Sequence, residues 1–320
     1  MRVSVSKCMI ALPLLVLISA MTVVPVFGQA QETVLQRELD SLFVIASSGE
    51  LRFREMVEPA IEKIAGLGAP VVPLLIDKFT TKSARERLTI INILKKIGLD
   101  AVPDLVAALD RTNGLVVQRV CWALGDIGDT SATVHLIRSY GHGRWQVRDQ
   151  AIGALGKTGD MRAEEVILEA LADSIGQVRK AAAVAAGKLK ITSAVDLLIT
   201  RLGDSFYGAR MSAVAALLAL DTITVVSRLG DSFNSESKLV GDLACYVLGQ
   251  LGNDEAMEIL LGQVRSPNVN RRTHAALAII AADPYDNCGY HRFFLEQESD
   301  RLARIKISSA LADIVPFEAK

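Results

Sequence analysis

The sequence predicts an all-α protein built as a right-handed α-α superhelix of about seven stacked helical hairpins. Similar helix ends recur every 30 or 31 residues, and each repeat contains two apolar stripes at helical spacing. No stretch alternates apolar and polar residues in the way that a half-buried strand does. Because a single hairpin of this length cannot cover its own apolar face, each repeat is expected to pack on the next one.

The period is clearest where the second helix of each repeat is predicted to end. There a leucine is followed four residues later by a glycine, which suits a left-handed cap at a helix C-terminus. The segments are 94–98, 124–128, 155–159 and 248–252, with 186–190 and 217–221 filling the interval. These positions fix the register of the repeats along the chain.

The spacing of apolar residues predicts the two helices of each repeat. Apolar side chains occupy positions 163, 166, 167, 170 and 171, and then 178, 181, 182, 185 and 186. Both sets have the i, i+3, i+4 spacing of an amphipathic helix. Asp173-Ser174 and, one repeat later, Asp204-Ser205 suit the turn between the helices.

The same patterns divide the chain into four segments. We predict a signal peptide over 1–30, N-terminal capping helices over 31–67, repeats over 68–283 and C-terminal capping helices over 284–320. The cap helices are predicted at 33–48, 51–66, 291–298 and 300–314, where charged residues can face water. We expect one continuous domain without a linker.

The first thirty residues have the layout of an export signal. Arg2 and Lys7 precede an uncharged stretch, and the small residues Gly28 and Ala30 occupy positions −3 and −1 of a cut after Ala30. The uncharged stretch from Cys8 to Gly28 is also long enough to span a bilayer, so an uncleaved anchor is the alternative. Either way, the remaining chain is expected to be exported, to a periplasm or to the extracellular space.

Charge and cysteine content exclude several classes of partner and fold. The 35 Lys and Arg residues nearly balance the 36 Asp and Glu residues, so no strong field attracts nucleic acid or an anionic membrane. We expect no nucleic-acid partner, and membrane contact only through residues 1–30 if they are not cleaved. After a cut, Cys121, Cys245 and Cys288 remain, and this odd number excludes a fully paired disulfide framework.

The repeat units resemble a known family. Residues 101–110 followed by 116–128 resemble the HEAT-like repeat of the phycobilisome-lyase type. Its first helix reads Ala-Val-Pro-x-Leu, and its second reads Val-Arg and then Ala-x-x-Ala-Leu-Gly-x-x-Gly. The resemblance covers about residues 60–283 and implies a solenoid of the HEAT/armadillo type, although such a fold says little about function.

In that family a turn aspartate and a second-helix arginine form a hydrogen-bonded ladder that links the repeats. Carried over to this chain, the resemblance implies a ladder of Asp173 with Arg179 and of Asp204 with Arg210. It also implies breaks, because His142 replaces the aspartate before Arg148 and Val117 replaces the arginine after Asp110.

The resemblance raises the question of catalysis. Deoxyhypusine hydroxylase is similar in fold, but its iron ligands lie in His-Glu pairs, and this sequence contains none. Phycobilin lyases act on cytoplasmic pigment proteins, which does not suit an exported chain. No nucleophile triad, phosphate loop or metal half-site is apparent, so we predict no catalytic residue, no cofactor, no metal and no enzymatic activity. A lyase-like enzyme or enzyme accessory is the alternative, and it requires a deep polar pocket with a reactive side chain.

The second helices are expected to line the concave face, so the residues exposed there are found by adding the period. One row reads Gln118, Asp149, Lys180, Met211 and Asp242, and the next reads Trp122, Gly153, Val184, Ala215 and Tyr246. Mixed charges and small residues around two large rings suit a protein or peptide partner. In the alternative interpretation, the small residues only allow neighbouring helices to approach.

Two turns are irregular. The segment 140–145 places His142, Arg144 and Trp145 among glycines, where Trp145 either covers the helix start as a hydrophobic staple or belongs to an exposed recognition tip. The hexapeptide at 201–206 recurs 27 residues later at 228–233, which predicts a short first helix and a long turn at 234–238. That turn is either drift in a duplicated unit or a loop that contacts a partner.

These observations predict a non-enzymatic, monomeric protein-binding or scaffold module of the cell envelope or extracellular space. Its partner would bind on the concave face of the second helices. The predicted contact residues are Trp122, Tyr246, Gln118, Asp149, Lys180, His142, Arg144 and Trp145.

Overall fold

The computed structural model describes residues 34–233, 237–284 and 289–314. The predicted signal at 1–30, Cys288 and residues 234–236 of the irregular turn lie outside this part. Across the described residues the regular structure is helical and contains no strand, which confirms the predicted fold class. In the same residues no single helix has both the length and the apolar character of a membrane span; only a pair bent by 106°, Val57–Ala65 with Ala69–Lys78, meets both criteria together.

The chain divides into two compact units, Met1–Ala108 and Leu109–Lys320, where the sequence suggests one continuous domain. The helices of the first unit are 34–46, α2 (Val57–Ala65), α3 (Val72–Lys78), α4 (Ala84–Ile97) and α5 (Val102–Ala108), with 3-10 turns η1 (Leu51–Phe53), η2 (Ala69–Val71) and η3 (Gly98–Ala101). The helix predicted over 51–66 begins only at Val57, which leaves Pro59 in the first turn, where proline is tolerated.

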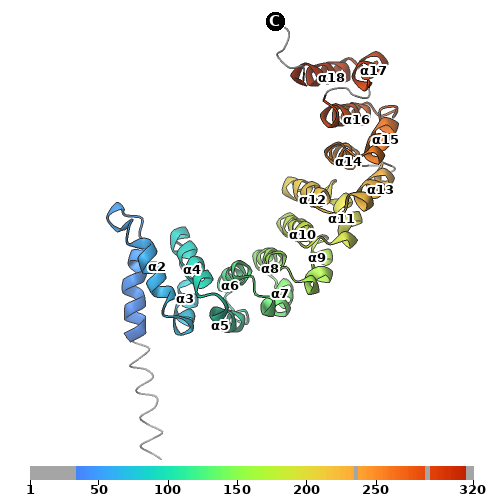
Figure 1. Cartoon of the computed structure of the whole chain (residues 1–320). Helices are drawn as coiled ribbons and strands as arrows, with labels where there is room; N and C mark the ends of the chain where they lie inside the picture. The colour runs from blue at the N-terminus through green and yellow to red at the C-terminus, as the bar shows by residue number, and fades with distance from the viewer. Residues whose placement is uncertain (1–33, 234–236, 285–288, 315–320) are drawn as a thin grey trace, which may run out of the picture. The chain divides into compact units, whose positions relative to one another are not determined.

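The second unit is a stack of helices that alternate between two rows. Its helices are α6 (Gly114–Ile127), α7 (Thr133–Tyr140), α8 (Trp145–Thr158), α9 (Glu164–Ala170), α10 (Gly176–Leu189), α11 (Val195–Arg201), α12 (Tyr207–Ala219), α13 (Thr222–Ser232), α14 (Lys238–Leu251), α15 (Asp254–Gln263), α16 (Val269–Ala282), α17 (Tyr290–Gln297) and α18 (Arg301–Ile314). The 3-10 turns η4 (Thr130–Ala132), η5 (Met161–Ala163) and η6 (Thr192–Ala194) precede α7, α9 and α11. Within this unit the even-numbered helices from α6 to α16 follow the inner side of a curve and α7 to α15 the outer side (Figure 1).

The predicted apolar positions face the interior of this stack. All five positions of the first helix, 163 to 171, are buried, and so are four of the five in the second helix. The exception is Ala181, which is half-buried because it lines a groove on the inner side of α10. Amphipathic spacing therefore identified the core, and its one deviation marks an open surface.

The predicted helix ends are also present. Gly128, Gly159 and Gly252 follow α6, α8 and α14 in the left-handed region, with φ of 78°, 75° and 61°. Lys190 ends α10 in the same conformation at φ 58°, although it carries a side chain. The repeated backbone geometry at these ends keeps successive hairpins in register.

Small residues hold successive inner helices close together. A Cβ added at any of four glycines would lie only 2.8 to 2.9 Å from an alanine of the next inner helix; the pairs are Gly125 with Ala154, Gly156 with Ala185, Gly187 with Ala216 and Gly249 with Ala278. Between α12 and α14 the corresponding residues are Leu218 and Val247. At the four glycines, therefore, small size serves helix packing.

The arginine ladder exists, but its register differs from the one that the resemblance implies. Arg148 Nε and Nη2 donate to the Asp173 carboxylate at 2.8 and 3.0 Å, and Arg179 donates in the same way to Asp204 at 2.6 Å for both bonds. Arg179 meets Asp173 only through its backbone carbonyl, to which Nη1 donates at 2.7 Å. The implied side-chain pairing of Asp173 with Arg179 is thus wrong.

The correction has a simple geometric reason. An arginine six residues after the turn aspartate can reach the carbonyl groups of its own turn, while the forked end of its side chain extends to the carboxylate of the next turn. Arg210 shows the first part of this arrangement, since its Nη1 donates to the Asp204 carbonyl at 2.6 Å, while the Asp204 carboxylate accepts from Arg179; the implied side-chain pairing of Asp204 with Arg210 is therefore also wrong. Sequence reasoning missed the last rung, in which Arg272 of α16 pairs with Glu298 before α18 at 3.0 Å.

The irregular repeat also differs from expectation. Its first helix, α13, has 11 residues, whereas α9 and α11 have 7 each, so the prediction of a short helix is wrong. Asp221 explains why α13 starts early in its repeat. Its carboxylate accepts a hydrogen bond from the Thr224 backbone amide at 2.9 Å and thereby caps the helix. The helix thereby includes residues that form a 3-10 turn in preceding repeats.

Candidate functional site

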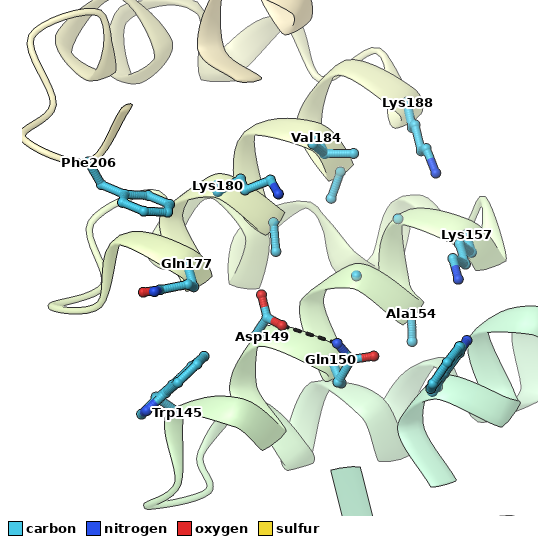
Figure 2. Close-up of a pocket in the computed structure, with 15 residues that line it drawn as sticks. Trp145, Asp149, Gln150, Ala154, Lys157, Gln177, Lys180, Val184, Lys188 and Phe206 are labelled. Atoms are coloured by element: carbon cyan, nitrogen blue, oxygen red, sulfur yellow. Dashed lines mark hydrogen bonds between the residues drawn. The ribbon is translucent and has the colours of Figure 1, made fainter. Parts of the chain in front are cut away.

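A groove of about 530 Å³ lies on the inner side of the second unit. Residues of α6, α8 and α10 line it, together with Phe206 at the start of α12 (Figure 2). Three aromatic rings contribute to its walls: Trp122, Trp145 and Phe206. The groove thus lies on the concave row of helices that the sequence indicates.

The indole of Trp122 is held in place by a hydrogen bond within its own helix. Its Nε1 donates to Asp126 Oδ2 at 3.1 Å, one helical turn further along α6. Asp126 also accepts a hydrogen bond at 2.6 Å from the ammonium group of Lys157 on α8. Because the polar edge of the indole is satisfied within the protein, its apolar face is available to a ligand without a desolvation cost for the N–H group.

The floor of the groove is open because one position lacks a side chain. Gly153 lies between Trp122 and Val184 in the predicted row, and a Cβ added there would meet nothing within 4 Å. At Gly156, three residues along the same helix, an added Cβ would instead lie only 2.8 Å from Ala185 Cβ. Glycine therefore has two different roles on α8, close helix packing at Gly156 and an unfilled space at Gly153.

Asp149 is the acidic group of this groove (Figure 2). Partial burial raises the pKa of its carboxyl, and this effect exceeds the opposing influence of the hydrogen bond from Gln150 and of the positive charge on Lys180. The Gln150 amide donates to Asp149 Oδ2 at 3.1 Å. The carboxylate is thus a partly desolvated acceptor on the groove surface.

The two ends of the groove differ in chemistry. Trp145, Gln177 and Phe206 lie at one end, where α8 and α10 begin (Figure 2). Phe206 packs over the start of α10, since a Cβ at Gly176 would be 2.5 Å from the Phe206 Cβ. The sequence analysis did not include Phe206 among the groove residues. Its position between the Asp204 turn and the start of α12 is the signal that could have indicated it.

The opposite end is basic. Lys157 and Lys188 occupy equivalent positions near the ends of α8 and α10 (Figure 2). Residues 126, 157 and 188 are equivalent positions of successive inner helices. Lys157 pairs with Asp126 on the inner helix before it, whereas the equivalent position before Lys188 is occupied by a lysine, Lys157. Within the described part of the second unit, Lys188 has no carboxylate partner.

The structure gathers four of the eight predicted contact residues. Trp122, Trp145, Asp149 and Lys180 all line the groove. Trp145 is the first residue of α8, so it does not hold the position before the cap that a hydrophobic staple requires.

The other four predicted residues lie elsewhere. His142 and Arg144 pack over Gly114 at the start of α6, with atoms 3.2 and 2.5 Å from the place of its missing Cβ. Gln118 is half-buried on α6 outside the groove lining. Tyr246 is 47% exposed on α14, four inner helices after Trp122, so it cannot share the same groove.

Other reactive groups are sparse in the described residues. No cluster of three or more His, Cys, Asp or Glu side chains there could hold a metal ion. Cys121 and Cys245 are fully buried free thiols, and this burial raises the pKa of each to about 12. Both behave as small core side chains, as the sequence suggests.

Comparison with known proteins identifies the repeat type. The family model described as HEAT repeats matches residues 72–148 and 134–218, so this stretch consists of HEAT repeats. No curated protein matches the chain.

Solved structures with a similar fold include human deoxyhypusine hydroxylase in complex with glycerol, at 20% identity over 77% of this chain and 96% of that one, with a TM-score of 0.34. The CpcE–CpcF complex of phycocyanin lyase from Nostoc matches at 19% identity over 76% and 94%, with a TM-score of 0.38. YibA from Escherichia coli matches at 16% identity over 75% and 92%, with a TM-score of 0.48. At such low similarity, no ligand, reaction or partner is transferred to this chain.

The comparisons correct one prediction. The sequence led to the conclusion that the chain is not an enzyme, yet the similar structures include a hydroxylase and a lyase. The conclusion rested on missing motifs, such as His-Glu pairs, in a fold that enzymes also use. The absence of familiar motifs is therefore not a valid ground for excluding catalysis, and the conclusion is withdrawn.

Proposed function

We propose that the chain is a binding module that takes a peptide segment of a protein partner into the groove of α6, α8 and α10. The observation that supports this most directly is the opening at Gly153, beside a Trp122 ring whose polar edge is already satisfied. Aromatic residues in preformed apolar depressions are the usual anchors of protein interfaces. A scaffold role for HEAT repeats is consistent with this proposal.

The energetic argument rests on preorganisation. Trp122 is fixed through Asp126 and Lys157, and Phe206 is packed on Gly176, so neither ring has to be ordered when a ligand arrives. Less conformational entropy is then lost on binding. Burial of one large apolar side chain of the ligand contributes about 1.5–3 kcal/mol.

Filling the groove tests the proposal. We expect a displayed library of random twelve-residue peptides, selected on residues 31–320, to yield binders that lose at least tenfold in affinity for Gly153→Leu. The leucine would occupy the space beside Trp122 without meeting another atom at its Cβ. Peptide affinity is measured by fluorescence anisotropy.

A second variant controls for the added side chain. Gly262 of α15 is exposed and also has nothing within 4 Å of the place of its Cβ, so Gly262→Leu adds the same group away from the groove. Affinity should be unchanged in this variant. Selected peptides that bind wild type and Gly153→Leu equally well, or no enriched peptide at all, would refute groove binding.

We also propose that the module acts outside the cytoplasm, in the periplasm or extracellular space. The support is the basic start, the uncharged stretch and the Gly28–Ala30 pair of the sequence. Expression of the full chain in a bacterium with an export pathway should give a mature protein that begins at Gln31, as read by N-terminal sequencing of the exported fraction. A chain that keeps Met1 and remains in the cytoplasm would contradict this.

A further inference from the structure

The groove has a polarity that narrows the chemistry of its ligand. The aromatic side chains of Trp145 and Phe206 are at one end, and the ammonium groups of Lys157 and Lys188 are at the other (Figure 2). The lining contains three lysines and one carboxylate, that of Asp149, while the whole chain has a formal net charge of −1. The groove is thus locally basic on a protein that is not.

Of the two lysines at the basic end, only Lys157 is paired with an internal carboxylate. Asp126 is bonded to Lys157 at 2.6 Å, and at the equivalent position one repeat before Lys188 stands a lysine, Lys157, in place of a carboxylate. Like charges on adjacent helices repel, and an external carboxylate placed between them relieves that repulsion. Lys188 is exposed and keeps its charge available to a ligand.

The length of the groove sets the spacing of the ligand groups. Trp145 and Lys157 are twelve residues apart on α8, which corresponds to about 18 Å of helix. An extended peptide advances about 3.3–3.6 Å per residue, so about five residues cover this distance. The path between the ends crosses Gly153, where no side chain obstructs it.

We infer that the groove recognises an extended, acidic segment of a partner protein, in which an aromatic side chain and a carboxylate side chain are separated by about five residues. The aromatic group packs against Trp145 and Phe206, and the carboxylate pairs with Lys188 and Lys157. This inference rests on the proposed function and adds the class of peptide that the groove selects.

Charge reversal in defined peptides tests it. The probes are fluorescein-labelled, acetylated and amidated peptides Phe-Ser-Gly-Ser-Ser-Glu-Glu and the same sequence ending in Gln-Gln or Lys-Lys. At low ionic strength we expect wild type to bind the Glu-Glu peptide at least tenfold more tightly than the Gln-Gln peptide. Lys188→Glu should lose that preference and bind the Lys-Lys peptide better than wild type does.

Two controls separate the causes. Lys238→Glu makes the same charge change at an exposed position at the start of α14, outside the groove, and should keep the wild-type preference. A peptide that ends in Ser-Ser with a free carboxylate tests recognition of a chain end. If it binds as tightly as the Glu-Glu peptide, the inference of an acidic side chain is overturned.

The outcomes also separate this inference from the proposed function. Library binders that depend on Gly153 but show no acidic preference overturn the inference and leave groove binding intact. Absence of measurable binding by the Glu-Glu peptide likewise overturns the inference. Binding that neither Gly153→Leu nor Lys188→Glu changes overturns both.

Discussion

Replacing Asp204 with alanine is expected to lower the free energy of unfolding of the second unit by about 3 kcal/mol. The Asp204 side chain is 1% exposed and accepts two bonds from Arg179 at 2.6 Å and the Phe206 amide at 2.8 Å. The variant leaves the Arg179 guanidinium, itself only 12% exposed, without its carboxylate. Urea denaturation followed by circular dichroism measures the change.

An exposed pair provides the control. Asp196 lies 3.5 Å from Arg228 with both side chains more than half exposed, so Asp196→Ala should cost less than about 0.5 kcal/mol. Equal losses in the two variants would show that the ladder contributes no more than a surface ion pair.

The Asp204→Ala substitution should also change how the free energy of unfolding depends on pH. Burial alone would raise the pKa of Asp204, but the Arg179 and Phe206 hydrogen bonds outweigh burial and hold this pKa below 3.8. The ionised carboxylate therefore stabilises the fold above the unfolded-state pKa, and this contribution is lost as the pH falls through the lower folded-state pKa. Asp204→Ala should lack this part of the acid-induced destabilisation of the wild type.

Leucine at position 156 is expected to destabilise the second unit by about 3 kcal/mol, whereas leucine at position 153 should leave it unchanged or stabilise it by up to about 1 kcal/mol. A Cβ at Gly156 would lie 2.8 Å from Ala185 Cβ and 2.9 Å from its Cα, so α8 and α10 must separate. At Gly153 nothing lies within 4 Å of an added Cβ, and leucine is a better helix former than glycine.

The two variants control for each other, because they add the same side chain to the same helix three residues apart. Urea midpoints measured side by side give the difference. A Gly153→Leu protein as unstable as Gly156→Leu would mean that the space beside Trp122 is filled, and the groove proposal would lose its basis.

The fold could be predicted from the sequence because each repeat presents the same local evidence. The buried positions of α9 and the left-handed glycines after α6, α8 and α14 follow from spacing and backbone sterics alone. The late start of α2 and the extended α13 did not follow, because Pro59 and the Asp221 cap act through detailed geometry at one helix end. Those effects involve single residues and leave no periodic pattern.

The candidate site was only half predictable. Adding the period placed Asp149, Lys180 and Trp122 on one surface, since equivalent positions of stacked helices face the same way. The period does not indicate how far a surface extends, so it grouped Tyr246 with residues four inner helices away. Nor does it show that Gly153 is open while Gly156 is packed, since that depends on distances to α10.

The shifted ladder has a consequence for how such a chain can change length. Arg148 and Arg179 reach forward to the acids of the following turns, Asp173 and Asp204, and Arg272 reaches Glu298. Recombination that removes or duplicates one entire period, for example between the Asp173 and Asp204 turns, leaves those of these three arginines that are kept with a carboxylate ahead of them. A deletion of half a period leaves one guanidinium without a receiving group, so viable relatives of different length should differ by whole multiples of the period.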